Sequence, residues 1–230
     1  MAKRKVSQTE TVIAEEVSAV SVQSLWEKYQ NVILYVLGGI LVVVLGWWLY
    51  NKLIVEPRQT EAVAAMWQAE QQFGRDSFQL ALENPGGGFD GFLAIADKFG
   101  GTPAGNLANY YAGICYLNTG NFDGAIEHLK DYSPKTDDMA AVRNGCIGDA
   151  YAEKQDFSTA EGYYKKAANA TKNELIAGYY LKKLGMFYEF QNKKEEAVKA
   201  FERLRTDFPN PASNDWREVE KYIYKLGAGK

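Results

Sequence analysis

The hydrophobic pattern of the chain is dominated by one uninterrupted apolar stretch near its amino-terminal end. Residues 32–50 read VILYVLGGILVVVLGWWLY and contain no charged side chain. As an α-helix this stretch spans roughly 28 Å, about the thickness of the hydrocarbon core of a bilayer. Aromatic residues lie at both of its ends, as is typical where a helix passes the headgroup layer: Trp26, Tyr29, Tyr35, Trp47, Trp48 and Tyr50. The pattern predicts a transmembrane helix.

A cleaved signal peptide and a buried core helix are the alternatives for residues 32–50. A signal peptide has a short basic lead and a small-residue cleavage site, whereas residues 1–31 precede this stretch and Trp-Trp-Leu-Tyr ends it. A soluble core helix seldom runs this far without a charge. We therefore expect an uncleaved anchor that contacts the lipid bilayer through residues 32–50.

The flanks of the apolar stretch differ in positive charge. Lys3, Arg4, Lys5 and Lys28 precede it, and Lys52 and Arg58 follow it. Because basic residues favour the cytoplasmic side, we expect a cytoplasmic amino terminus and a single pass, with the rest of the chain on the other side. Residues 1–14 are predicted to be a disordered cytoplasmic tail, and residues 15–31 a short interfacial helix that leads into the span.

Beyond Pro57 the apolar positions follow helical spacing. No segment alternates between apolar and polar residues with period two, so the fold class is predicted to be all-α. NPGGG at residues 84–88 and GGTP at residues 100–103 interrupt the pattern. The expected helices are 58–83, 89–99, 103–118, 121–131, 136–153, 156–171, 174–190, 193–208 and 215–226.

One spacing of small and aromatic residues occurs three times. A Gly is followed by Tyr three residues later and by Ala twelve residues later, at intervals of 35 and 37 residues. Two antiparallel helices need small residues where their axes come closest, so we expect the Gly of each first helix and the Ala of each second helix to meet there, and the Tyr to lock one pair against the next. The three sets are Gly113, Tyr116 and Ala125; Gly148, Tyr151 and Ala160; and Gly185, Tyr188 and Ala197.

This period resembles the tetratricopeptide repeat. The resemblance implies an α-solenoid of three to four helix pairs over residues 51–230, with a C-terminal capping helix. Its units lie near 58–101, 106–140, 141–177 and 178–212, and the cap covers 213–230. The sequence departs from the family pattern at the early Trp position, where Asn109, Asn144 and Leu181 stand. The first unit also lacks the Gly–Tyr pair, as an end repeat can.

Composition offers little material for chemistry. The net charge is −3 without a basic face, which argues against nucleic-acid binding. The glycine-rich NPGGGFDGF at 84–92 lacks the Gly-Lys-Ser/Thr of a phosphate loop. His128 is read as a solvated surface residue, and Cys115 and Cys146 as two buried thiols, with a disulfide bridge as the alternative. We therefore predict no enzyme, no catalytic or metal site and no cofactor.

The remaining candidate site is the inner face of the repeats. In a stack of helix pairs the first helices line the concave side, with Asp149 and Ala152 in the middle unit. This face is aromatic and aliphatic unless neighbouring helices cover it, and it suits an extended apolar segment or a partner helix. The predicted partner-binding residues are Leu107, Tyr110, Ile114, Leu117, Tyr179, Lys182, Met186 and Phe190.

The layout of the whole chain resembles YfgM-like ancillary subunits of the SecYEG translocon. These too have a short polar tail, one span that ends in Gly-Trp-aromatic, and an Ala- and Gln-rich helix that runs into tetratricopeptide units. The resemblance implies a bacterial inner-membrane protein with periplasmic repeats that assists secreted or outer-membrane proteins. Its expected partners are the SecYEG translocon, periplasmic chaperones or nascent secreted chains. The alternative is a structural scaffold of another envelope complex, in cell-wall, secretion or motility machinery.

Overall fold

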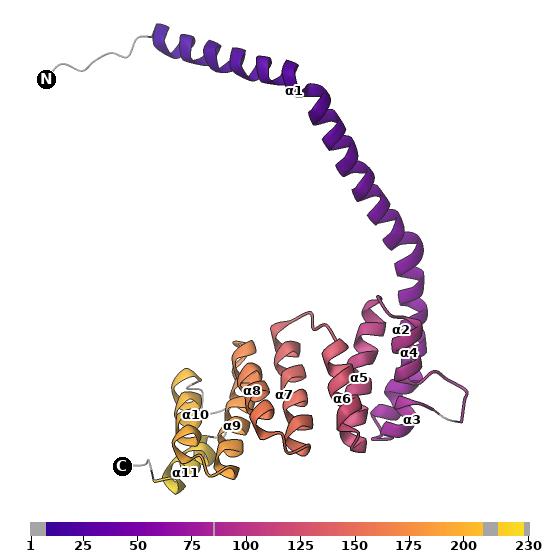
Figure 1. The fold of residues 1–230 in the computed structure, drawn as a ribbon, viewed down its shortest axis with the longest axis vertical. Helices are drawn as coiled ribbons and strands as arrows, with labels where there is room; N and C mark the ends of the chain where they lie inside the picture. Colours follow the sequence, from indigo (N-terminus) through magenta and orange to yellow (C-terminus); the bar gives the residue numbers. More distant parts are fainter. Residues whose placement is uncertain (1–7, 85, 209–215, 228–230) are drawn as a thin grey trace, which may run out of the picture. The chain divides into compact units, whose positions relative to one another are not determined.

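A computed structural model describes residues 8–84, 86–208 and 216–227, and in these ranges the regular structure is helical throughout. The chain divides into two units, Met1–Pro57 and Arg58–Lys230, and each is described by itself. Figure 1 shows one long helix in the first unit and a row of short helices in the second. The chain is therefore all-α, with one long apolar helix followed by a repeat domain, as predicted.

The first unit consists of α1 (Gln8–Tyr50) and a π-helical turn (Asn51–Val55). The helix that contains residues 32–50 is long and apolar enough to cross a membrane, and its apolar window is not buried within the protein. At its exit the Asn51 side-chain amide donates a hydrogen bond to the Trp47 carbonyl oxygen, 3.0 Å away. This bond satisfies a backbone acceptor where the α-helical ladder changes to the wider turn.

Two expectations for the amino-terminal region differ from the structure. Residues 8–14 were expected in a disordered tail and residues 15–31 in a separate interfacial helix, but all of them belong to α1. No Gly or Pro occurs between Gln8 and Leu37, so the sequence gives the helix no point at which to break. Residues 1–7 lie outside the described ranges.

The second unit begins with an irregular group of helices. A single helix was expected over 58–83, but α2 (Glu56–Phe73) ends before a turn in which Asp76 has a φ of 57°, and α3 (Phe78–Leu82) follows. The helix expected over 89–99 is α4 (Phe92–Lys98). It starts late because Gly91 lies against α3: a Cβ on Gly91 would be 2.4 Å from the Leu82 carbonyl oxygen.

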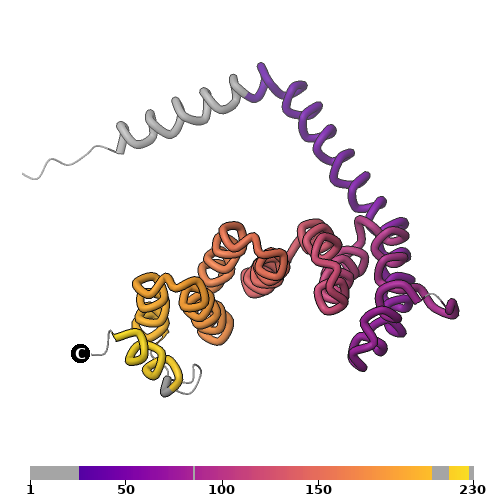
Figure 2. The backbone as a smooth tube through the Cα atoms, turned by 60° about the horizontal axis from the view of Figure 1, so that its bottom comes forward, coloured from indigo at the N-terminus to yellow at the C-terminus, as the bar shows by residue number. Residues whose placement is uncertain are grey.

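Three helix pairs and a last helix then follow one another, and Figure 2 shows the pairs side by side. Side-chain caps define several starts, as where the Thr102 hydroxyl accepts a hydrogen bond from the Gly105 amide. All of these helices begin and end within a residue or two of the predicted positions. They are α5 (Pro103–Thr119), α6 (Phe122–Asp131), α7 (Asp137–Glu153), α8 (Phe157–Ala170), α9 (Glu174–Phe190), α10 (Lys194–Asp207) and α11 (Trp216–Lys225).

The repeated glycines are the points of closest approach within each pair. A Cβ on Gly148 would lie 2.8 Å from Tyr164 Cδ1, closer than carbon atoms pack. The same contact occurs in the other two pairs, always with the residue sixteen positions later: Gly113 with Leu129, and Gly185 with Phe201. The alanines of the pattern, Ala125, Ala160 and Ala197, are fully buried. The close-packing role predicted for the glycines is therefore confirmed, but their partners are these bulky side chains and not the alanines of the pattern.

Two of the three repeated tyrosines, Tyr151 and Tyr188, connect their pair to the pair before it. Lys130 Nζ donates to the Tyr151 hydroxyl (3.1 Å), and the Tyr188 hydroxyl donates to Glu161 Oε1 (3.1 Å). Lys193 Nζ reaches the same carboxylate at 2.7 Å. Burial disfavours the charged form of Glu161, but hydrogen bonds from two lysines and Tyr188 outweigh it and lower the pKa of this carboxyl to about 2. The pairs are thus joined by side-chain bonds as well as by apolar contact.

The glycine contact predicts that two single Gly→Leu substitutions differ in their effect on stability. Gly148→Leu should lower the free energy of unfolding by about 1–3 kcal/mol, because the new side chain overlaps the Tyr164 ring. Gly162→Leu on α8 is the matched control, since a Cβ there meets nothing within 4 Å. Thermal unfolding of the full chain in detergent, followed by circular dichroism, measures both. Equal melting temperatures for the two variants would contradict the proposed role of Gly148.

Candidate interaction groove

The predicted partner-binding residues separate into two groups by exposure. Tyr179, Met186 and Phe190 on α9 are 57%, 43% and 71% exposed. Leu175, which the sequence reasoning missed, is 60% exposed and lies in the same row. Helical spacing of four, seven and four residues places these four side chains along one face, called here the α9 stripe. Leu107, Tyr110, Ile114, Leu117 and Lys182 are only half exposed.

Tyr110 is held between other rings rather than open to a partner. Its ring centroid lies 5.3 Å from that of Tyr132 and 5.7 Å from that of Tyr111. Burial, with a smaller effect from the nearby Cys146, raises the pKa of Tyr110 to about 12. Leu107 likewise packs against the core around α2–α5. This part of the predicted face is therefore covered by neighbouring helices.

Lys182 also differs from its predicted place in an open groove. Its ammonium group pairs with the Glu218 carboxylate of α11. A second pair, Lys225 to Glu189 at 2.5 Å, joins the same two helices. That side of α9 therefore faces α11. The partner lies 36 residues away in the sequence, and no spacing pattern within α9 indicates it.

Two adjacent hollows lie at the carboxyl ends of the first helices, and together they are called the groove here. The first hollow, of about 630 Å³, is lined by Leu117, Asn118, Gly120, Phe122, Asp149, Ala152, Glu153, Tyr164 and Lys183. The second, of about 530 Å³, is lined by Ala152, Glu153, Gln155, Phe157, Phe187 and Phe190. Ala152 and Glu153 belong to both, so they form the wall between the two hollows.

The repeat itself aligns the residues of the groove. Asn118, Glu153 and Phe190 each follow the repeated glycine of their helix by five residues. Phe122 and Phe157 are each the first residue of a second helix. Because the glycine contact fixes each pair in the same way, equivalent positions recur from one pair to the next. This register is a signal that could have located Glu153 and Phe157 from the sequence.

The interior of the first hollow holds one ion pair. Lys183 Nζ lies 2.6 Å from Asp149 Oδ1, and the Tyr164 hydroxyl donates to the same oxygen at 2.6 Å. Burial acts to lower the pKa of Lys183, but Asp149 outweighs it and the pKa is raised. These bonds join α7, α8 and α9 behind the groove. Glu153, in contrast, is exposed and has no ion pair within the described ranges.

Two helix pairs of the repeat domain match a known family. The model of the tetratricopeptide repeat matches residues 107–133 and 183–211. These two segments are similar to the tetratricopeptide repeat. They cover most of the α5/α6 and α9/α10 pairs, and the α7/α8 pair between them has the same glycine contact. The matched model describes a repeat rather than a catalytic domain, and no curated protein matched the chain.

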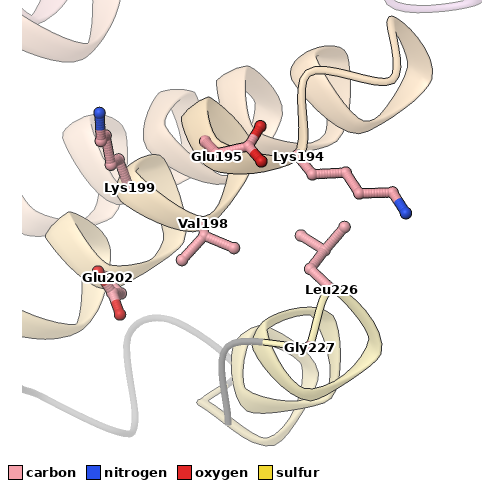
Figure 3. A pocket seen from close by; sticks show the side chains of 7 residues that line it. All are labelled: Lys194, Glu195, Val198, Lys199, Glu202, Leu226 and Gly227. Carbon is pink, nitrogen blue, oxygen red and sulfur yellow. The ribbon is translucent and has the colours of Figure 1, made fainter.

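A further hollow, of about 360 Å³, lies at the carboxyl-terminal end of the repeats, between α10 and the end of α11. Figure 3 shows Val198 and Leu226 on either side of it, while the charged ends of Lys194 and Lys199 point away. Its other lining residues are Glu195, Glu202 and Gly227. With two apolar side chains at its centre, it offers a partner less apolar contact than the groove does.

The histidine and the two cysteines considered in the sequence analysis are all packed within the repeats. His128 is half-buried rather than solvated: Nδ1 lies 2.9 Å from Asn109 Oδ1, and the ring stacks on Tyr116. Cys115 and Cys146 are free thiols, and burial raises the pKa of each to about 12. Within the described ranges no three His, Cys, Asp or Glu side chains are grouped to hold a metal ion.

The raised thiol pKa values predict slow alkylation of the native protein. Iodoacetamide at pH 8 should modify neither Cys115 nor Cys146 in the folded chain, because the raised pKa values leave little of the reactive thiolate. Both should be modified after denaturation without any reductant, since the structure has no bridge between them. Intact-protein mass spectrometry counts the added groups. Failure to alkylate the denatured, unreduced protein would show that the two thiols form a disulfide.

Proposed function

We propose that this chain is a membrane-anchored protein–protein interaction module. The observation that carries the proposal is the α9 stripe beside the second hollow, in a tetratricopeptide-repeat domain that follows one apolar helix. Exposed rings at such density are typical of a surface that a partner covers. Anchoring raises the effective concentration of this surface near other proteins of the same membrane, so even weak contacts contribute to binding.

In its finer form, the proposal is that the chain is an ancillary subunit of the Sec translocon in the bacterial inner membrane. There its repeats would assist secreted or outer-membrane proteins at the periplasmic face. The layout of span and repeats supports this reading, as does the excess of basic residues before residue 32. A structural scaffold of another envelope complex uses the same module with different partners. The proteins that remain bound after gentle detergent extraction distinguish the two.

The proposal predicts that exposed rings on α9 are needed for partner binding. Replacing both Tyr179 and Phe190 with Ser should leave the helical circular-dichroism signal unchanged, because both side chains are exposed, yet abolish copurification of SecYEG with the tagged chain. Tyr224→Ser is the matched control, since Tyr224 is equally exposed but lies on α11. A second variant exchanges residues 32–50 for an unrelated apolar span. If the double variant keeps its partners and this second variant loses them, the membrane span and not α9 carries recognition.

The predicted orientation is tested by labelling from one side. Lys135→Cys, an exposed position between α6 and α7, should react with a membrane-impermeant maleimide on intact spheroplasts. Glu27→Cys, which is exposed on the other side of the span, should react only after lysis. The unmodified chain is the background control, because Cys115 is buried and Cys146 is half-buried. Labelling of Glu27→Cys alone on intact cells would reverse the topology.

A further inference from the structure

We infer that the groove selects an extended segment with a basic side chain between two apolar ones, and that Glu153 is the residue that selects the basic side chain. This inference rests on the proposed function and specifies the partner of the same site. It follows from three features of the groove: its division into two hollows, the charge on the wall between them, and the distance between neighbouring first helices.

The two hollows are each suited to an apolar side chain. Leu117 and Phe122 line the first. Phe157 lines the second. The centroid of its ring lies 6.1 Å from the centroid of Phe187 and 5.8 Å from that of Phe190. Edge-to-face rings at such distances form a preorganised apolar surface. Between the hollows stands Ala152, whose small side chain lets a bound backbone pass close to α7.

Charge on the dividing wall is negative and unpaired. The charged residues lining the two hollows are Asp149, Glu153 and Lys183. Asp149 is neutralised by Lys183 and also accepts the Tyr164 hydroxyl, so neither member of that pair is available to a ligand. Glu153 lines both hollows, so its side chain lies on the groove side of α7. A partner that crosses the wall therefore meets one free carboxylate.

The distance between the hollows favours an extended chain. Packed helices lie about 8–10 Å apart, so neighbouring hollows have roughly that separation. In the extended polyproline II conformation a chain advances about 3.1 Å per residue with three residues per turn, so side chains three positions apart lie on one face and span about 9 Å. A segment with apolar residues three positions apart can fill both hollows and place an intervening basic side chain over Glu153. An Arg or Lys there gains an ion pair with an exposed carboxylate, which contributes modestly to binding.

A pair of synthetic peptides tests the charge selection on the full chain in detergent. The probe is a fluorescein-labelled peptide, Gly-Ser-Leu-Ser-Arg-Leu-Ser-Gly, and its match has Glu in place of Arg. Fluorescence anisotropy should show about 3- to 10-fold tighter binding of the Arg peptide, falling as salt is raised. Glu153→Gln should remove most of that preference, and Glu153→Lys should reverse it. Glu195→Lys on α10 is the matched control, since Glu195 is exposed and lines neither hollow.

Other outcomes overturn the inference in distinguishable ways. Equal binding of the two peptides, lost equally on Phe190→Ser, would show an apolar groove without charge selection and leave the proposed function standing. Charge preference that persists in Glu153→Gln would assign it to another residue. If neither peptide binds, the groove does not take such a segment. That result alone leaves the proposed function standing. The proposed function fails too if the Tyr179 and Phe190 double variant still copurifies with its partners.

Discussion

Paired helices in the repeat domain approach so closely at three glycines that one added carbon atom has no room. Gly113, Gly148 and Gly185 each lie against a bulky side chain sixteen residues later, and this contact permits only one register between the helices of a pair. Because all three pairs have the same contact, their two helices pack in the same way in each pair. The alignment of Asn118, Glu153 and Phe190, and with it the groove, depends on that equivalence.

Side-chain bonds between the pairs keep this alignment from one unit to the next. Glu161 is the clearest example, because it receives hydrogen bonds from α8, α9 and the start of α10, and its lowered pKa keeps it charged well into the acidic range. Asp149 and Lys183 act in the same way behind the groove. Bonds of this kind contribute modestly to stability, but they restrict rotation of one pair on another. A repeat domain that holds its shape can present a groove without first ordering it, which lowers the entropic cost of binding.

Much of the fold could be predicted from the sequence because it depends on local signals. Capping residues and turn glycines mark the helix ends from Pro103 to Phe190, and a three-point spacing shows which residues pack together. Contacts between segments far apart in the sequence are not indicated by any local sequence pattern. The pairing of Lys182 with Glu218 depends on how α11 packs, and the burial of Tyr110 depends on Tyr132. The break after Phe73 was missed although Gly74 follows it directly, because the positive φ that turns the chain falls on Asp76 and not on the glycine.

Positions that the repeat does not need are the ones that distinguish this groove from others of its kind. The glycine, tyrosine and alanine of the pattern are fixed by packing, so they carry information about the fold and none about the partner. Five residues beyond each glycine, packing makes no demand, and the chain has Asn118, Glu153 and Phe190 there. An amide, a carboxylate and an aromatic ring differ in charge and polarity along one row. We propose that the order of these three groups, rather than the repeat, sets which segment the groove can accept.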